Sequence, residues 1–152
     1  MTIEVRTTDV AETMMVGRRL ASLARPGDVI ALVGPLGAGK TAFVGGLAEG
    51  LGINEPITSP SFVLMRRYDS GFTPLVHVDV YRLASLGEFE DLEAYEEGRE
   101  GVVVIEWGDA IAQALPANHL TVELTPLSET ERSVRLVACG DWESRPLGEL
   151  TA

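Results

Sequence analysis

The sequence contains few cysteines and few basic residues, and both shortages restrict what the protein can be. Cys139 is the single cysteine among 152 residues, so no disulfide can form within the chain. It has no Cys or His neighbour at metal-ligand spacing, and we interpret it as a small buried apolar side chain. Only 12 Lys and Arg residues stand against 23 Asp and Glu residues, which gives a formal net charge of −11. An extended nucleic-acid surface needs cations to neutralise phosphates, so we do not expect strong direct RNA binding.

Long apolar runs are also missing. Residues 1–6 include no basic patch followed by an apolar segment, and no run approaches the ~18 apolar residues that a membrane span needs. We therefore expect a cytoplasmic protein with no membrane association. Hydrophobic residues make up 45% of the chain, and the length suits a single domain over residues 1–152. We expect residues 140–152 to form a loose C-terminal tail.

The apolar pattern predicts alternating strands and helices. The predicted strands cover residues 2–6, 28–33, 62–68, 74–80, 102–105, 119–125 and 132–139. The predicted helices cover a stretch from a capping box at Asp9-Val10-Ala11-Glu12 to Pro26-Gly27, and residues 40–50, 84–97 and 109–115. Asp69-Ser70-Gly71 is a hairpin turn signal, so the strands on either side of it should pair antiparallel. This order predicts a three-layer α/β domain with a mixed parallel and antiparallel sheet.

One segment has a pattern that specifies its chemistry. Gly34-Pro35-Leu36-Gly37-Ala38-Gly39-Lys40-Thr41 fits G-x-x-x-x-G-K-[ST] and lies between an apolar strand and a helix, the setting expected of a phosphate-binding loop. In such a loop the backbone N–H groups converge on the β-phosphate, Lys40 reaches the β- and γ-phosphates, and the Thr41 hydroxyl coordinates Mg²⁺. We expect nucleotide contacts from Gly37, Ala38, Gly39, Lys40, Thr41 and Ala42.

Two acids follow buried strands and are candidates for a second metal-organising group. Glu106 follows residues 102–105, and Asp79 follows residues 75–78. Periodicity does not say which acid holds the metal and which orients water or senses the γ-phosphate. His77 is a lone histidine on a strand, and such a residue is more often structural than catalytic.

Three further segments accompany the loop: Thr58-Ser59-Pro60-Ser61-Phe62, His77-Val78-Asp79-Val80-Tyr81-Arg82-Leu83 and Ile105-Glu106-Trp107. Together the four segments resemble the TsaE (YjeE) family of bacterial ATPases in tRNA threonylcarbamoyladenosine biosynthesis. The resemblance runs from about Thr13 to Arg135. It implies a P-loop NTPase-like fold, ATP or ADP with Mg²⁺ as ligands, and TsaB and TsaD subunits as partners. Hydrolysis would reset the complex that modifies adenosine 37 of tRNA. This chain would then contact tRNA only indirectly, through that complex.

The resemblance also assigns roles within the site. It implies that Thr41 and Glu106 are Mg²⁺ ligands, and that Asp79 lies near the γ-phosphate and orients the attacking water. Lys40, Asp79 and Glu106 would then be the catalytic residues, with Thr13 and Arg132 as outer nucleotide contacts. Four positions depart from the family pattern, namely Pro35, Ala42, Ser61 and Gly108. None of these departures removes a phosphate-binding or metal-binding group.

Three other functions are compatible with a phosphate-binding loop. A Ras-type GTPase is disfavoured because no [NT]-K-x-D guanine-reading segment occurs, so adenine is the expected base. A small-molecule P-loop kinase usually has an arginine-rich lid, whereas residues 84–100 are dominated by acids. A non-enzymatic adaptor, whose bound ATP holds switch loops in a partner-competent shape, stays open. Phosphate release that rises on addition of partner subunits would distinguish a slow, partner-stimulated ATPase from this adaptor.

Overall fold

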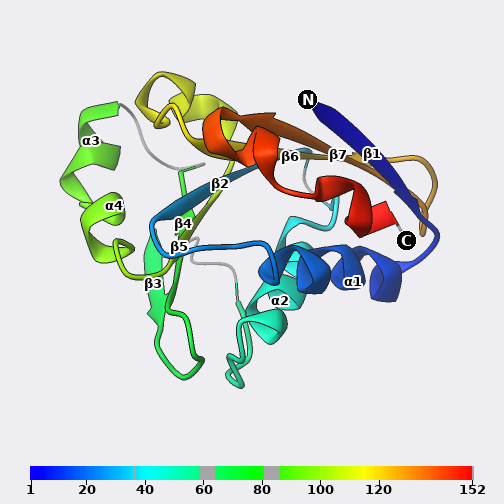
Figure 1. Cartoon of the computed structure of the whole chain (residues 1–152), viewed down its shortest axis with the longest axis horizontal. Helices are drawn as coiled ribbons and strands as arrows, with labels where there is room; N and C mark the ends of the chain where they lie inside the picture. The colour runs from blue at the N-terminus through cyan, green and yellow to red at the C-terminus, as the bar shows by residue number, and fades with distance from the viewer. Residues whose placement is uncertain (36, 59–63, 81–85, 152) are drawn as a thin grey trace.

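The computed structural model describes residues 1–35, 37–58, 64–80 and 86–151 (Figure 1). The strands are β1 (Thr2–Thr7), β2 (Asp28–Val33), β3 (Met65–Tyr68), β4 (Leu75–Asp79), β5 (Val102–Glu106), β6 (His119–Pro126) and β7 (Arg132–Cys139). The α-helices are α1 (Val10–Ala21), α2 (Lys40–Gly50), α3 (Leu86–Asp91) and α4 (Ala94–Glu97). Short 3₁₀ helices follow as η1 (Gly108–Ala114), η2 (Gly140–Ser144) and η3 (Leu147–Thr151).

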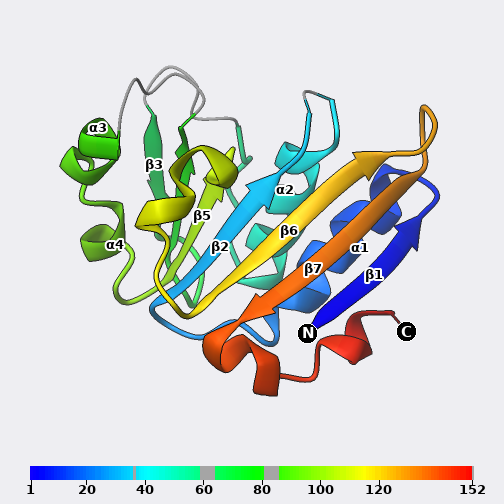
Figure 2. The same cartoon turned by 90° about the horizontal axis from the view of Figure 1, so that it is seen from above.

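The strands form one mixed sheet, as the sequence predicted. Its order is β1-β7-β6-β2-β5-β4-β3, and Figure 2 shows β1 at one edge and β3 at the other. The central strands β6, β2, β5 and β4 run parallel to one another, whereas the pairs β1–β7, β7–β6 and β4–β3 are antiparallel. The expected hairpin of β3 and β4 is confirmed. Because β2, β4 and β5 are parallel, their carboxyl ends meet at one edge of the sheet.

Helices cover both faces of this sheet, because its central strands are apolar on both sides. Val102 and Val104 of β5 belong to the core beneath α1 and α2. Val103 and Ile105 point the other way, into a second core with Phe89 of α3 and residues of α4 and η1. The residue that follows Ile105 therefore faces the α2 side.

Local capping and close packing position α1 and α2. The predicted N-cap forms, since Asp9 Oδ1 accepts from Glu12 N at 2.9 Å, while Glu12 Oε1 accepts from Thr8 N, one residue before the N-cap, at 2.6 Å. Hydrogen bonds from the Thr8 hydroxyl and backbone lower the pKa of Glu12. The two helices then cross in backbone contact, because a Cβ on Gly46 would collide with the carbonyl of Met14. This crossing fixes α2, and with it the segment that precedes α2.

The sequence prediction was less accurate outside the central sheet. The helix expected at 84–97 is two short helices, α3 and α4, because Glu93 between them has a left-handed φ of 54°. The stretch predicted as a helix at 109–115 is the 3₁₀ helix η1. Of the strand expected at 62–68, β3 covers Met65–Tyr68, and residues 62–63 lie outside the described residues.

The C-terminal segment is packed, so the prediction of a loose tail is wrong over residues 140–151. Trp142 and Leu147 are fully buried in the core shared with α1 and α2. Arg145 anchors the segment through two hydrogen bonds to Asp28, at 2.6 and 2.9 Å. Cys139 is partly exposed rather than buried. Within the described ranges, no helix is both long and apolar enough to cross a membrane.

Candidate phosphate-binding site

The segment between β2 and α2 presents a helix N-terminus that lacks a side-chain cap. Gly39 is the N-cap residue of α2 with a left-handed φ of 98°, and no side chain of the described residues caps it. The first turn carries no acid either. The N–H groups of a first helical turn have no partner within the helix, and they attract anions. This end of α2 is therefore suited to a phosphate group.

Lys40 brings its ammonium to the same place. Its side chain is buried, with the residue 5% exposed, and Nζ donates to the carbonyls of Gly34 at 2.6 Å and Pro35 at 3.0 Å. Nζ also lies 3.8 Å from the centroid of the Trp107 ring. Trp107 follows β5 directly, so this contact joins the end of β5 to the start of α2. A buried cation thus stands between the loop and the strand ends.

Arg132, at the start of β7, braces the loop from the other side. Its Nε donates to the Ala38 carbonyl at 3.0 Å, and a terminal nitrogen donates to the Gly37 carbonyl at 3.1 Å. The other terminal nitrogen donates to the carbonyls of Ser128 and Glu131. Arg132 was expected to be an outer nucleotide contact. In the structure its side chain lies against the backbone of the loop. Because the carbonyls point toward Arg132, it helps to set the direction of the loop peptides.

Thr13 reaches the same region from α1. Its hydroxyl is hydrogen-bonded to the Thr7 hydroxyl at 2.7 Å, and the residue is buried. A small pocket beside it is lined by Val10, Thr13, Gly39, Ala42, Thr130 and Arg132. Four of the residues predicted to contact nucleotide therefore meet around one hollow, although they come from three separate parts of the sequence.

The two candidate acids meet across adjacent strands. Asp79 and Glu106 are register partners at the ends of β4 and β5, and Leu32 of β2 is the partner of Glu106 on its other side. Both carboxyl groups lie on the α2 side of the sheet. Asp79 is 5% exposed and Glu106 is 4% exposed. Two buried carboxylates therefore lie at the strand ends beside the loop.

His77 is a site residue whose role sequence reasoning missed. It is fully buried on β4, and its Nε2 lies 2.5 Å from Oε2 of Glu106. The signal available in the sequence was spacing: His77 and Asp79 are two residues apart on one strand, so they share a face. His77 was expected to be structural rather than catalytic, and its hydrogen-bond partner is a candidate site acid.

Some predicted site residues lie outside the described residues. These are Leu36 of the loop, residues 59–62 of the second motif, and Tyr81, Arg82 and Leu83 of the third. Within the described ranges, no three His, Cys, Asp or Glu side chains gather in a way that could hold a metal ion. A hard cation bound here would therefore need oxygen ligands beyond protein carboxylates, such as a hydroxyl and phosphates.

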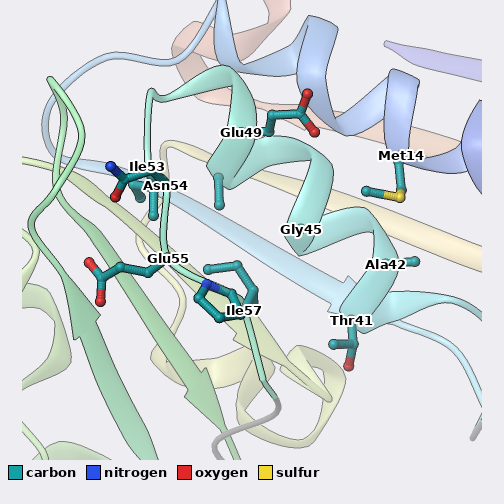
Figure 3. A pocket seen from close by; sticks show the side chains of 11 residues that line it. Met14, Thr41, Ala42, Gly45, Glu49, Ile53, Asn54, Glu55 and Ile57 are labelled. Atoms are coloured by element: carbon teal, nitrogen blue, oxygen red, sulfur yellow. The ribbon is translucent and has the colours of Figure 1, made fainter.

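A groove of about 590 Å³ runs along α2 and reaches Thr41 and Ala42 (Figure 3). Met14 lines one side, Thr41 and Ala42 line one end, and residues 53–57 line the other side. Glu49 and Glu55 place two carboxylates in its wall. These negative charges disfavour phosphates within the groove, so the loop is the better anion site.

Comparison with known proteins identifies the family. The family model described as "Threonylcarbamoyl adenosine biosynthesis protein TsaE" matches residues 7–134. The chain belongs to the TsaE family. The resemblance drawn from the four sequence motifs is confirmed.

Individual TsaE proteins match over most of their length. The tRNA threonylcarbamoyladenosine biosynthesis protein TsaE of Bacillus subtilis is 40% identical over 136 residues, covering 90% of this chain and 85% of the relative. The TsaE protein of Treponema pallidum is 47% identical over 124 residues, covering 81% and 91% respectively. The crystal structure of Bacillus subtilis YdiB matches with a TM-score of 0.81 at 37% identity, covering 98% of this chain and 93% of YdiB. The whole α/β arrangement is therefore shared with a solved structure.

Proposed function

We propose that the chain is a P-loop ATPase that binds ATP with Mg²⁺ and hydrolyses it slowly. In this proposal it acts with TsaB-type and TsaD-type subunits in forming threonylcarbamoyladenosine at position 37 of tRNA. Membership of the TsaE family supports the pathway. The arrangement of the loop supports the nucleotide chemistry, and the three-layer P-loop NTPase-like fold is part of the same proposal.

The observation that carries ATP binding is the buried ammonium of Lys40 beside the uncapped N-terminus of α2. Burial of a cation is costly unless its donors are satisfied, and two loop carbonyls satisfy Lys40. A nucleotide phosphate would offer anionic oxygens, which attract the ammonium more strongly than neutral carbonyl oxygens do. The loop N–H groups and Lys40 would then bind the same anion, with Gly37 to Ala42 as its surroundings.

The residues suited to hold Mg²⁺ are Thr41 and Glu106, because a hydroxyl and a carboxylate are the oxygen ligands that this cation takes alongside phosphates. When bound, the cation neutralises charge on the phosphates. Asp79 is the register partner of Glu106. We assign to Asp79 the role of orienting the attacking water. Thr13 and Arg132 contribute to the hollow beside Gly39 and Ala42, where we place outer parts of the nucleotide.

The described cations near the loop support slow hydrolysis. Among the described residues that contact the loop, Arg132 directs its donors to backbone carbonyls, so it is not placed as a finger on the γ-phosphate. An arginine finger is worth about 10³–10⁵ in rate in P-loop enzymes. A partner subunit would therefore raise the rate by completing the site.

A small-molecule kinase is less well supported than an ATPase. The acidic helices α3 and α4 contribute Phe89 and Ala94 to the core on the sheet face opposite α2. Lid residues of a kinase would have to cover the loop on the α2 side. In the described parts of the chain, these two helices therefore do not form such a lid.

The test is phosphate release, measured for the chain alone, for the chain with TsaB-type and TsaD-type proteins, and for Lys40→Ala under both conditions. We expect the wild-type chain to release phosphate slowly by itself and faster when the partner proteins are added. Lys40→Ala should release no phosphate under either condition. Fast release by the isolated chain would contradict the proposal. Nucleotide-dependent complex formation with no rise in phosphate release would instead support the adaptor function.

A further inference from the structure

His77 is a buried titratable residue to which the proposed ATPase mechanism gives no role. It lies in the middle of β4 with no exposed surface, on the same face as Asp79. Its Nε2 lies 2.5 Å from Oε2 of Glu106, which is itself buried. The other ring nitrogen, Nδ1, has no hydrogen-bond partner among the described residues.

These contacts favour one tautomer. An ionised carboxylate only accepts hydrogen bonds, so the bond to Glu106 requires the proton on Nε2 of His77. The geometry therefore assigns the donor to Nε2 of His77 and the acceptor to Oε2 of Glu106.

The bond restricts Glu106 more than packing alone would. A glutamate side chain has three rotatable bonds, and its carboxylate is fixed only where hydrogen bonds hold it. The His77 ring is itself fully buried on β4, which restricts its movement. With Oε2 engaged by His77, Oε1 would be left available to a bound cation.

We propose that His77 is a positioning residue that holds the Glu106 carboxylate in the orientation that binds the divalent cation of the bound nucleotide. The proposal rests on the proposed function, because it takes Glu106 as a ligand of that cation. Hydrogen bonds to metal-ligating side chains typically contribute 10–100-fold to metal affinity. His77 should therefore affect cation affinity while leaving the phosphate loop, and nucleotide binding without cation, unchanged.

The central test compares His77→Gln with His77→Asn. Both are neutral amides, but the Gln amide nitrogen reaches about the place of imidazole Nε2, whereas the Asn nitrogen reaches only that of Nδ1. Leu75→Ala is the control for lost packing, since Leu75 is fully buried on the same face of β4. Calorimetry measures ADP binding without cation, and electron paramagnetic resonance of free Mn²⁺ measures cation affinity of each ADP-bound protein.

We expect ADP affinity without cation to be the same in all four proteins. Mn²⁺ affinity should fall about 10–100-fold in His77→Asn, stay close to wild type in His77→Gln, and stay unchanged in Leu75→Ala. Equal Mn²⁺ affinity in wild type and His77→Asn, with ADP binding intact, would overturn the role of His77 alone. If wild type binds no ADP, both this inference and the proposed ATPase function are wrong.

A second measurement needs no substitution. The chain has two histidines, and Nδ1 of His119 lies 2.7 Å from the Pro116 carbonyl, so His119 should carry its proton on Nδ1. Nitrogen-15 NMR of histidine-labelled wild type should therefore show one ring protonated at Nε2 and one at Nδ1. Two rings protonated at Nδ1 would contradict the donation from His77 to Glu106, whatever the variants do.

Discussion

The ammonium of Lys40 lies over the indole of Trp107, with Nζ 3.8 Å from the ring centroid. The contact joins the residue expected to hold phosphates to the residue directly after Glu106. A cation over an indole face is an attractive interaction, and movement of the ammonium changes the environment of the ring. Trp107 is therefore placed to report what happens at the loop.

We predict that ATP binding changes Trp107 fluorescence, because Lys40 would exchange the loop carbonyls and the indole for phosphate oxygens. Trp142 is fully buried against Arg145, whose guanidinium carbon lies 3.8 Å from the Trp142 ring centroid. Trp142→Phe should keep the ATP-dependent signal and Trp107→Phe should lose it, provided that calorimetry shows both still bind. A signal that disappears with Trp142 would place the nucleotide against the C-terminal segment instead.

The two strand-end acids should have separable roles. Glu106→Ala removes a proposed cation ligand and leaves the loop intact, so Mg²⁺-free ATP affinity should persist while Mg²⁺-dependent hydrolysis is lost. Asp79→Ala should retain Mg²⁺-dependent ATP binding and lose hydrolysis, because the water is no longer oriented. Calorimetry with and without Mg²⁺, together with phosphate release, gives both readouts. If hydrolysis survives in Glu106→Ala, Asp79 is the principal metal acid and the two roles are exchanged.

The buried pair of Arg145 and Asp28 should be important for stability. Arg145→Met leaves the Asp28 carboxylate buried without its cation, and loss of one partner of a buried pair typically costs about 3–5 kcal/mol. Arg18 is the matched control, because its pair with Glu49 at 3.2 Å is exposed. Arg18→Met should cost only about 0–1 kcal/mol. Equal free energies of unfolding for the two variants in urea would show that the C-terminal segment does not depend on Arg145.

Tyr95 should make stability depend on pH at high pH. Burial raises the pKa of Tyr95 to about 12, and its hydroxyl donates to the Ala114 carbonyl at 2.8 Å. An unfolded tyrosine has a pKa of about 10, so the stability due to Tyr95 is complete below pH ~10 and is lost as pH rises toward 12. Tyr95→Phe should be less stable at pH 8, and its free energy of unfolding should fall less steeply across this range. Parallel curves for wild type and Tyr95→Phe would contradict the assignment.

The accuracy of the sequence-based predictions depended on how local each signal was. The strand at 28–33 and the helix at 40–50 have the predicted bounds, because continuous apolar residues and the glycine-rich loop specify both within one short stretch. The packing of Trp142 and Arg145 was not predicted. Arg145 meets Asp28 across 117 positions in the sequence, and only the folded core brings the two together.

The bond from His77 to Glu106 was missed for a related physical reason. The two residues are 29 positions apart, and they meet because β4 and β5 are neighbours with a register that pairs Asp79 with Glu106. Periodicity places each side chain on a face, but it does not say which strands are adjacent. The sequence therefore specified the residue types of the site, and the topology specified their contacts.

The central claim is that the loop from Gly34 to Thr41 binds ATP through Lys40. Its most direct test is calorimetric titration of ATP into wild type, Lys40→Ala and Arg135→Ala. Arg135 is an exposed cation on β7 that pairs with Glu123 at 3.1 Å, so its substitution removes the same charge away from the loop. We predict binding in wild type and Arg135→Ala, and loss or severe weakening of binding in folded Lys40→Ala. Unchanged ATP affinity in Lys40→Ala, or no binding by wild type, would contradict the account.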